Sequence, residues 1–451
     1  MRKTIIYRSS VYLLDRYTKL SDSLADSFIH LSNSLPNLQL VKQHIKDPLY
    51  RNSLFLMANN AVTVILGLIF WIVVARYYSK AEVGWGNAVI NAISLIALFS
   101  RLGLDVALIR FLPKAEKPVE MINSCFTISG IVSLLLAILF VAAVDMVSPQ
   151  LGFINNDARF PLAFIAFTVV WTLSGMIDQV FIARRRADFV LHKNTIYSVL
   201  KLILPFFMVL IFKSFGIVSS WGIAVGIGFF IALFLFLPRT LRIYRVRPRI
   251  EFGIIKSLWN YSFKNYFVTL FAAAPIYILP LIIVNRLGPE QSAYFSIAWI
   301  IAIALYIIPM GVAQSLFAEG SHFEDTLERD VRRSYKFIFI LLIPAIVLLL
   351  VLGKWLLLAF GTDYSKNALM LLRVFTISGV FVGINSVYYT ILQVKHRIRE
   401  LIVIAGFITL SALVTSYFIT PTVGIVGAGY AWAAANGIAS VYVLISFKWL
   451  R

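Results

Sequence analysis

The chain has 451 residues, of which 60% are hydrophobic and only 14% are charged. This composition excludes an ordinary soluble protein, because a water-facing surface needs more polar residues. The formal net charge of +20 at first suggests a nucleic-acid partner. The placement of the basic residues excludes nucleic acid and favours anionic membrane lipids as partners, because these residues gather in short segments between long apolar runs. The single cysteine, Cys125, excludes an intrachain disulfide and a cysteine-based zinc site.

Residues 1–50 form a basic, polar tail without the apolar core and cleavage site of a secretory signal. Within the tail, five apolar residues recur at helical spacing. They are Leu20, Leu24, Phe28, Leu31 and Leu35. This pattern predicts either an amphipathic helix on the inner membrane surface or a segment that covers the cytoplasmic side of the protein.

The stretch 54–110 sets the plan of the rest of the chain. Two runs free of charged residues, 54–75 and 86–100, are joined by the short polar segment Arg76–Gly84. An apolar run of about 20 residues has the length of a membrane-spanning helix. The sequence repeats this pattern and predicts an all-α polytopic membrane protein with twelve spans. The predicted spans are 54–76, 86–108, 123–146, 160–182, 195–212, 219–237, 258–284, 293–316, 336–357, 367–391, 400–419 and 424–446.

The distribution of Lys and Arg predicts the orientation. Thirty of the 41 basic residues lie in the tail, the five predicted inner loops and the C-terminus, whereas seven lie in the predicted outer loops. Because cytoplasmic loops carry an excess of Lys and Arg, both termini are expected in the cytoplasm, with the protein in the cytoplasmic membrane.

Short matches at nearly one offset suggest a duplicated six-helix unit. Val74-Ala75-Arg76 matches Val284-Asn285-Arg286, and Gly216-Ile217-Val218 matches Gly424-Ile425-Val426. The triplets Arg184–Arg186 and Lys395–Arg397 follow the fourth and tenth spans in the same way. Copies of six spans share one topology, so we expect two lobes, 51–237 and 258–451, about a central cavity. The basic segment 238–257 is then the linker between them.

Four basic residues lie inside predicted spans: Arg101, Lys201, Lys264 and Arg373. Charges inside a membrane are costly and by default indicate function. A cavity lined by cations would suit a phosphate or pyrophosphate. The structural alternatives are that Lys201 and Lys264 extend to the membrane surface and that Arg101 pairs with Asp105 one turn further on.

Uncharged amides and two acids complete the candidate residues. Asn59, Asn60, Asn87, Asn91 and Gln314 could contact sugar hydroxyls, or could simply join helices. Asp105 and Asp178 are candidates for ion coupling. The sequence contains no phosphate-binding glycine loop, HExxH pair or metal-binding Cys/His spacing. We therefore expect neither an enzyme nor a bound cofactor or metal.

Three runs resemble the first hairpin of O-antigen-type flippases. The resemblance lies in Arg76–Gly84, Leu98–Asp105 and Ala107–Pro113, and the glycines before the sixth and twelfth spans look similar. These flippases are polysaccharide-biosynthesis transporters of the multidrug/oligosaccharidyl-lipid/polysaccharide exporter superfamily. The resemblance covers roughly residues 50–446. It implies two six-helix lobes of the multidrug-exporter type, alternating access and transfer of a lipid-linked oligosaccharide from the inner to the outer leaflet.

The hypothesis is therefore a flippase for a polyprenyl phosphate- or pyrophosphate-linked glycan, with glycan-assembly enzymes as further partners. A cation-coupled multidrug exporter on the same fold is the first alternative, with Asp178 as its candidate carboxylate. A membrane scaffold for glycan-assembly enzymes is the second.

Overall fold

The computed structural model describes residues 48–212, 215–241, 244–320 and 327–446, so most of the predicted tail lies outside the described residues. The first lobe contains α3 (Pro48–Tyr77), α4 (Lys80–Ser100), α5 (Leu104–Phe111), η2 (Leu112–Lys114), α6 (Pro118–Val147), η3 (Pro149–Asn156), α7 (Arg159–Ala183), α8 (Ala187–Phe212), α9 (Gly216–Ile231), η5 (Ala232–Phe236) and α10 (Leu237–Thr240). The second lobe contains α11 (Phe252–Leu287), α12 (Pro289–Gly320), α13 (Leu327–Phe360), α14 (Thr362–Asn367), α15 (Leu369–Val394), α16 (Ile398–Val423) and α17 (Ile425–Ser446).

Long apolar helices make up nearly all of the described chain. Eleven of the described helical segments are long and apolar enough to cross a membrane. The remaining long helix, α8, corresponds to the predicted fifth span but begins eight residues before it. The prediction of an all-α, multi-pass membrane protein is confirmed for the residues that the structure describes.

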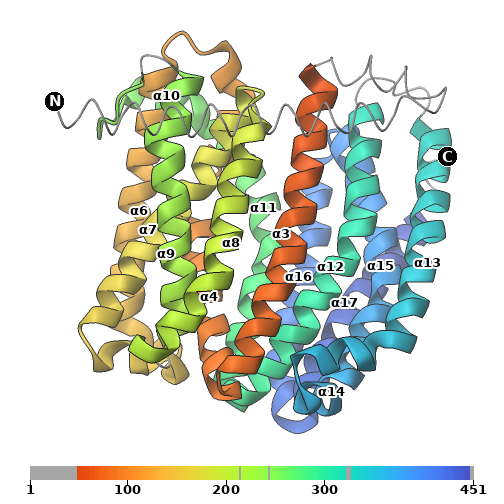
Figure 1. Ribbon diagram of the computed structural model, residues 1–451. Coiled ribbons are helices and arrows are strands. Elements are labelled where there is room, and N and C mark those ends of the chain that lie inside the picture. The colour runs from red at the N-terminus through yellow and green to blue at the C-terminus, as the bar shows by residue number, and fades with distance from the viewer. Residues whose placement is uncertain (1–47, 213–214, 242–243, 321–326, 447–451) are drawn as a thin grey trace, which may run out of the picture.

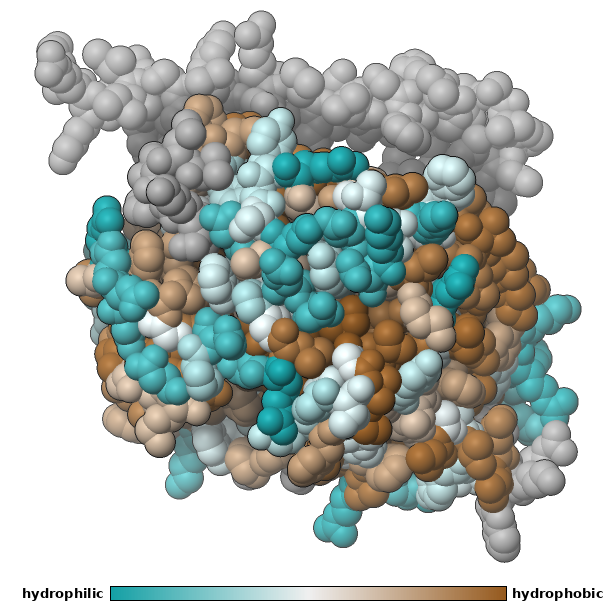
Figure 2. All heavy atoms as spheres, turned by 90° about the horizontal axis from the view of Figure 1, so that it is seen from below, coloured by the Kyte–Doolittle hydropathy of each residue, from teal (hydrophilic) through white to brown (hydrophobic). Residues whose placement is uncertain are grey.

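The two lobes stand side by side with their helices roughly parallel (Figure 1). One end of the molecule, here called the basic end, carries the turns Arg184–Arg186 and Lys395–Arg397. The other, here called the α14 end, carries η3 and α14. Figure 2 looks onto the α14 end and shows hydrophilic side chains gathered over much of it, with hydrophobic side chains between and around them.

The predicted second span, 86–108, is wrong as a continuous helix. A capping box of Ser79 and Glu82 begins α4, which ends at Ser100. Leu102 and Gly103 then take left-handed backbone angles, with φ of 52° and 73°. A right-handed helix cannot pass through such a pair, so α5 starts anew at Leu104. The break also lets the backbone approach α11 closely, because a Cβ at Gly103 would lie 2.4 Å from the Ser262 carbonyl oxygen.

The repeated basic triplets form the same turn. Arg185 and His396 both have left-handed φ angles, of 56° and 54°. In the first turn, the amides of Arg184, Arg185 and Arg186 donate to the carbonyls of Val180, Ile182 and Phe181. In the second turn, the amides of Lys395, His396 and Arg397 donate to the carbonyls of Ile391, Gln393 and Leu392. The match holds residue for residue and supports the duplication inferred from the sequence.

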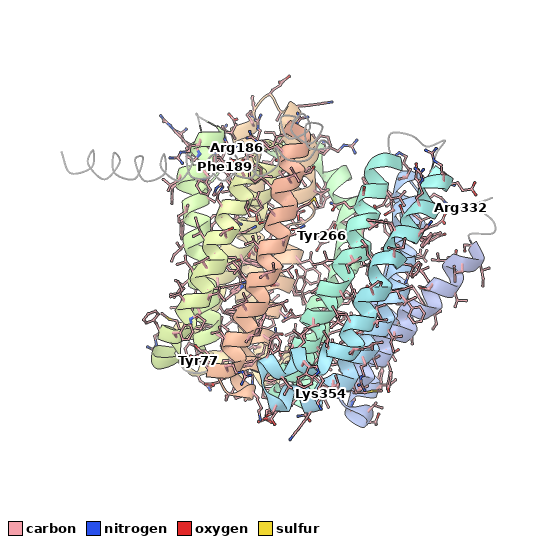
Figure 3. All side chains as sticks on the ribbon, turned by 45° about the vertical axis from the view of Figure 1, so that its right-hand side comes forward. Tyr77, Arg186, Phe189, Tyr266, Arg332 and Lys354 are labelled. Carbon is pink, nitrogen blue, oxygen red and sulfur yellow. The ribbon has the colours of Figure 1, made fainter. Side chains whose placement is uncertain are left out.

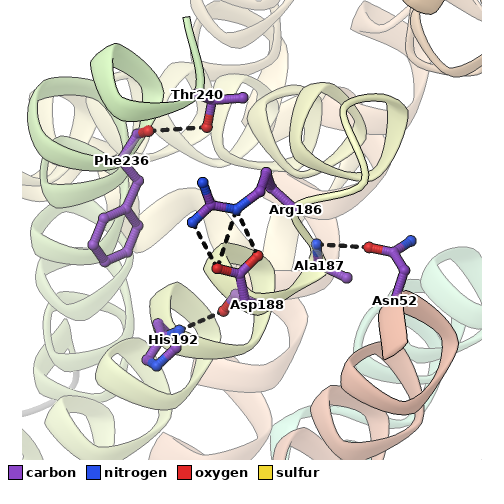
Figure 4. A network of polar contacts seen from close by, with 7 residues as sticks. All are labelled: Asn52, Arg186, Ala187, Asp188, His192, Phe236 and Thr240. Carbon is purple, nitrogen blue, oxygen red and sulfur yellow. Dashed lines mark hydrogen bonds and ion pairs between the residues drawn. The ribbon is translucent and has the colours of Figure 1, made fainter. Parts of the chain in front are cut away.

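Neighbouring side chains tie the first of these turns to the lobe (Figure 4). The Arg186 guanidinium donates to both Asp188 carboxylate oxygens, with Nη2 2.7 Å from Oδ2, and lies over the Phe189 ring at 3.7 Å. The Ala187 amide donates to Asn52 Oδ1 on α3 at 2.9 Å. The start of α8 is therefore fixed to α3 at the basic end.

The lobes meet through polar contacts at the α14 end. The Arg76 guanidinium on α3 donates to the carbonyls of Leu358 and Ala359, at 2.7 and 2.9 Å, in the last turn of α13. This caps carbonyls that have no partner within their own helix. Lys80, the first residue of α4, forms an ion pair with Asp363 on α14. We call these two contacts the outer latch.

Deeper in the same end, α4 packs directly on α12. Ser296 Oγ donates to Asn87 Oδ1 at 2.7 Å. A Cβ at Gly84 would lie 1.8 Å from the Pro289 carbonyl oxygen, so only glycine allows this approach. The lobes are thus in close contact at the α14 end.

The linker and the start of α11 pack on the first lobe. Asn123 Nδ2 on α6 donates to the Arg245 carbonyl at 3.0 Å, and the Glu251 amide donates to Ser124 Oγ at 2.9 Å. Further along, α11 packs against both α4 and α16. This helix is shared between the lobes, so the domain limits predicted at 237 and 258 remain a proposal.

The left-handed turns generate a stability prediction. An L-residue in this conformation costs about 1–2 kcal/mol, a cost that glycine avoids and a β-branched residue increases. Arg185 is exposed, and its side chain has no partner among the described residues, so its replacement isolates the backbone effect. We expect Arg185→Val to unfold more easily than Arg185→Gly by about 1–2 kcal/mol in denaturant titrations, with the same order at His396. Equal stabilities would contradict this account of the turn.

Candidate functional site

A cavity of about 430 Å³ lies within the second lobe. Five helices line it: α11, α12, α15, α16 and α17. The lining residues are Phe271, Ala272, Pro275, Ile276, Trp299, Ile303, Tyr306, Met310, Ala313, Gln314, Phe317, Val382, Asn385, Ser386, Tyr389, Thr390, Gln393, Ala405, Ile408, Thr409, Trp432 and Asn436. The volume falls within the range of roughly 300–1,000 Å³ that is usual for small-molecule sites.

The cavity reaches from the middle of the lobe toward the basic end. Gln314 lies six residues before the end of α12, and Gln393 lies one residue before the end of α15, both at that end. Both glutamines are exposed, as is Phe317. A ligand would therefore enter the cavity from the basic end.

Three aromatic rings form the inner wall. Trp299 meets Trp432 edge to face, with ring centroids 5.2 Å apart, and Tyr306 lies nearly parallel to Trp432 at 6.4 Å. The Tyr306 hydroxyl donates to the Phe375 carbonyl at 2.7 Å, which fixes its ring. Trp299 and Tyr306 are almost fully buried, whereas Trp432 is partly exposed. Of the three rings in this wall, Trp432 is therefore the one that a ligand in the cavity can reach.

A network of amides joins α15 to α17 beside these rings. Asn385 Nδ2 donates to the carbonyl and the side-chain oxygen of Asn436, at 3.1 and 3.3 Å. Ser440 Oγ donates to Asn385 Oδ1 at 3.1 Å, and Asn436 Nδ2 donates to the Trp432 carbonyl at 3.0 Å. Each amide side chain has two donors and two acceptor positions, so hydrogen-bonding capacity remains for a ligand.

Pro275 lies in the α11 wall of the cavity and interrupts the hydrogen bonding of that helix. Proline has no amide hydrogen, so the carbonyl four residues earlier, on Phe271, loses its helical partner. Thr409 Oγ1 on α16 donates to this carbonyl at 2.5 Å. The free carbonyl of Phe271 is thus satisfied by a neighbouring helix, as a polar group inside a membrane requires.

Arg101 lies outside this cavity, at the end of α4. Its Nη1 lies 3.9 Å from Asp105 Oδ2, and the side chains are 20% and 13% exposed. The guanidinium packs on α7, since a Cβ at Gly175 would lie 2.2 Å from Arg101 Nη2. Arg101 Nε is buried without a hydrogen-bond partner among the described residues. The guanidinium therefore keeps donors that a bound anion could use.

Lys193 is a buried cation that the sequence reading assigned to an inner loop. That assignment is wrong, because α8 begins at Ala187 and Lys193 lies within this helix. Lys193 Nζ donates to Asp178 Oδ2 at 2.8 Å and to Ser174 Oγ at 2.9 Å. Asp178 and Lys193 lie seven residues before Arg185 and seven after Arg186, so the α7–α8 hairpin sets them side by side. The equal spacing of Asp178 and Lys193 from the turn is the sequence pattern from which this pair could have been predicted.

Lys201 is buried inside the first lobe. Its ammonium lies 4.6 Å from the Tyr197 ring centroid and 5.4 Å from that of Phe70. It donates to the Tyr197 hydroxyl at 3.4 Å. The rings stabilise the cation in place of a carboxylate. Lys201 is not among the residues that line the cavity of the second lobe.

The other two predicted cations are Lys264 and Arg373. The side chain of Lys264 lies outside the described residues. Arg373 on α15 is exposed and shares a helix face with the exposed Met370 and Ile377. This face is opposite the one that lines the cavity, so Arg373 points away from it. The roles assigned to both residues remain predictions.

The predicted amides fall into three places. Asn59 accepts a hydrogen bond from Asn194 at 2.9 Å, which joins α3 to α8, and Asn60 beside it is exposed. Asn91 donates to Asn87 Oδ1 at 2.7 Å near the α14 end. Gln314 alone among the predicted amides lines the cavity.

The outer latch is an exposed, charge-dependent contact. The Lys80 ammonium holds the pKa of the Asp363 carboxyl below its usual range. A carboxyl with a lowered pKa stabilises the contact fully above its unfolded pKa of about 4 and loses this effect as pH falls further. The latch is therefore formed at neutral pH.

This chain is similar to known proteins in its sequence and in its fold. A family model described as polysaccharide biosynthesis protein matches residues 73–369. A candidate O-antigen transporter of Shigella flexneri is 28% identical over 163 residues. These residues are 35% of this chain, which spans only 38% of the length of that relative.

Two solved structures share the fold. One is the lipid II flippase MurJ in an inward closed conformation, with a TM-score of 0.71 and 16% identity over 88% of this chain and 87% of that one. The other is an inward-facing multidrug resistance transporter of the MATE family, with a TM-score of 0.64 and 16% identity over 86% of this chain and 96% of that one. At these identities the likeness establishes the fold, including the predicted two-lobed arrangement.

The buried pair of Lys193 and Asp178 generates a prediction. Removing one partner leaves an uncompensated buried charge, at a cost of about 3–5 kcal/mol. We expect Lys193→Met to lower the free energy of unfolding by about that amount, and Lys193→Met with Asp178→Leu to recover most of it. Denaturant titration in detergent measures both variants.

The matched control is an exposed pair, Arg397 and Glu400, on the same protein. Breaking it through Glu400→Gln should change stability by less than about 1 kcal/mol. A double variant at Lys193 and Asp178 as unstable as the single one would contradict a charge-based explanation.

Proposed function

We propose that this protein, which belongs to the polysaccharide biosynthesis protein family, moves a lipid-linked oligosaccharide across the cytoplasmic membrane. The carrier in this proposal is a polyprenyl phosphate or pyrophosphate, and the movement runs from the inner to the outer leaflet. The named relatives are transporters and flippases, which supports transport rather than catalysis. Glycan-assembly enzymes are the proposed source of the substrate.

The observation that carries the proposal is that Arg101 Nε is buried without a hydrogen-bond partner among the described residues, while Nη1 lies 3.9 Å from Asp105 Oδ2. Arg101 lies where α4 breaks, close to α11, the helix shared between the lobes. Figure 3 places Tyr266 of α11 between the two lobes, and its hydroxyl donates to the Phe99 carbonyl beside Arg101. A phosphate is the natural partner of an arginine with free donors. Lys264 and Lys201 are the further cations of the proposed site.

The closed end supports the proposed direction of transport. In Figure 3 the two lobes approach each other toward the end that carries Tyr77 and Lys354. We take the basic end as cytoplasmic, from the distribution of Lys and Arg in the sequence. The head group then enters from the cytoplasm, and release on the far side requires the outer latch to part while the lipid tail stays in the bilayer.

A cation-coupled multidrug exporter is the second candidate, because the fold is also that of a MATE transporter. It needs a carboxylate able to exchange its ion. Asp178 is held by Lys193 at 2.8 Å, which disfavours that role. Dye efflux by the wild type that disappears in Asp178→Asn, with no flipping of lipid-linked sugar, would favour the exporter.

The flippase proposal is tested by replacing Arg101. We expect Arg101→Ala to slow the flipping of a polyprenyl-pyrophosphate-linked sugar by at least about tenfold, because a charged hydrogen bond contributes roughly 1.5–3 kcal/mol. Arg101→Lys should keep part of the rate. A leaflet-resolved assay in proteoliposomes measures this.

Arg332→Ala is the matched control, because Arg332 is exposed and pairs only at the surface with Glu328. A deletion strain should also accumulate unflipped lipid-linked glycan. Normal glycan export in that strain, or an unchanged rate in Arg101→Ala, would count against the proposal, and the second outcome would favour a scaffold.

The outer latch predicts a conformational requirement. In a Lys80→Cys, Asp363→Cys variant, a short bifunctional maleimide should bridge the lobes and stop flipping, because the α14 end could no longer open. The one native cysteine, Cys125, is buried and should not compete. Each single-cysteine variant, treated in the same way, should keep its activity. Full flipping by the bridged double variant would show that this end does not open during transport.

A further inference from the structure

The cavity of the second lobe has a chemical character different from that of the cationic site. Its lining residues, as far as the structure describes them, include no acidic or basic side chain. Amides, hydroxyls and aromatic rings supply all of its polarity. In addition, Trp299 is only 3% exposed, and its Nε1 is buried in this wall without a hydrogen-bond acceptor among the described residues.

We propose that this cavity is a binding site for the uncharged sugar rings of the transported glycan, separate from the site for its phosphate. The inference rests on the proposed function and deepens it by naming the class of head group. Neutral hexose and N-acetylhexosamine units fit this class. Glycans with carboxylate groups on the rings that enter the cavity do not.

The shape and the donors of the cavity match a sugar ring. One face of a pyranose is a row of C–H groups, which packs on an aromatic face, and its edge carries hydroxyls. The partly exposed ring of Trp432 offers the face, held from behind by Tyr306 and from the side by Trp299. Asn385 and Asn436 stand beside that ring with spare hydrogen-bonding positions.

The unpartnered indole N–H of Trp299 is an independent sign of a ligand. Buried donors nearly always find an acceptor, and one left alone inside a membrane protein is costly. A sugar hydroxyl or acetamido oxygen in the cavity would accept this hydrogen bond. A lipid acyl chain would not, since it has no acceptor.

The absence of charge in the described lining decides between neutral and anionic rings. A carboxylate transferred into this cavity would lose its hydration without gaining a cation, which costs several kcal/mol. Cations are instead grouped in the first lobe, at Arg101 and Lys201. Each lobe thus binds a different part of the substrate, with the phosphate on one side of α11 and the sugars on the other.

The experiment compares three probes on one polyprenyl pyrophosphate carrier. The first bears a neutral disaccharide, the second a disaccharide with glucuronic acid, and the third no sugar. Binding is measured by titration calorimetry in detergent, and transport by leaflet-resolved flipping in proteoliposomes. The variants are Trp432→Ala, Trp432→Phe and Asn436→Ala. Trp355→Ala is the matched control, because Trp355 lies on α13 with 67% of its surface exposed and does not line the cavity.

We expect wild-type protein to bind the neutral probe at least about tenfold more tightly than the glucuronic acid probe. Trp432→Ala should weaken binding of the neutral probe about tenfold, or about 1.4 kcal/mol, and leave the unglycosylated carrier unchanged. Trp432→Phe should keep most of the affinity, and Trp355→Ala all of it.

The inference is overturned if Trp432→Ala binds the neutral probe as the wild type does, or if it weakens all three probes equally. Equal wild-type affinity for the two disaccharide probes overturns it as well. So does Trp432-dependent binding of tetraphenylphosphonium without binding of the neutral probe, which would indicate an exporter. Failure of the proposed function looks different, since the wild type would then flip no probe while Trp432-dependent binding of the neutral probe persisted.

Discussion

Inside a bilayer, no water is available to satisfy a charge or a hydrogen-bonding group, and this constraint explains where the polar residues of this protein lie. Lys193 is surrounded by Asp178 and Ser174. The carbonyl freed by Pro275 is met by Thr409. Groups that break this rule therefore stand out. Among the described residues, Arg101 Nε and the Trp299 indole N–H are two such groups, and these are the groups at which the proposed ligand would complete the hydrogen bonding.

The duplicated scaffold carries different chemistry in its two halves. The turns at Arg185 and His396 agree in backbone angle and in the three backbone hydrogen bonds that form each turn, so the frame has been kept. The side chains it holds have diverged. Among the described residues, the buried cations Lys193 and Lys201 lie in the first lobe, and aromatic rings with amides line the cavity of the second. A substrate with a charged phosphate and an uncharged glycan would find one partner in each half.

Between these halves, α11 and the outer latch set the geometry of movement. The first turns of α11 are tied to the first lobe through Glu251 and Ser124, and its middle packs on α16 of the second. The latch of Arg76 and Lys80 is made of exposed polar contacts, which cost little to break in water. A seal of this kind suits an end that must open and close repeatedly.

The sequence alone determined the number of long helices and the class of membrane protein, because apolar runs of this length and composition have no other stable arrangement. It also indicated the duplication, because the same turn in each half is marked by a basic triplet at the corresponding position, Arg184–Arg186 and Lys395–Arg397. It could not place side chains that depend on which helices pack together. Lys193 was taken for a loop residue, and the break at Leu102 and Gly103 was missed. Arg373 points away from the cavity of the second lobe, and its predicted role stays a prediction. Only the tertiary structure decided these points, because a helix has several faces and packing selects the one that meets a partner. The same holds for the cavity, whose walls come from five helices that span residues 252–446.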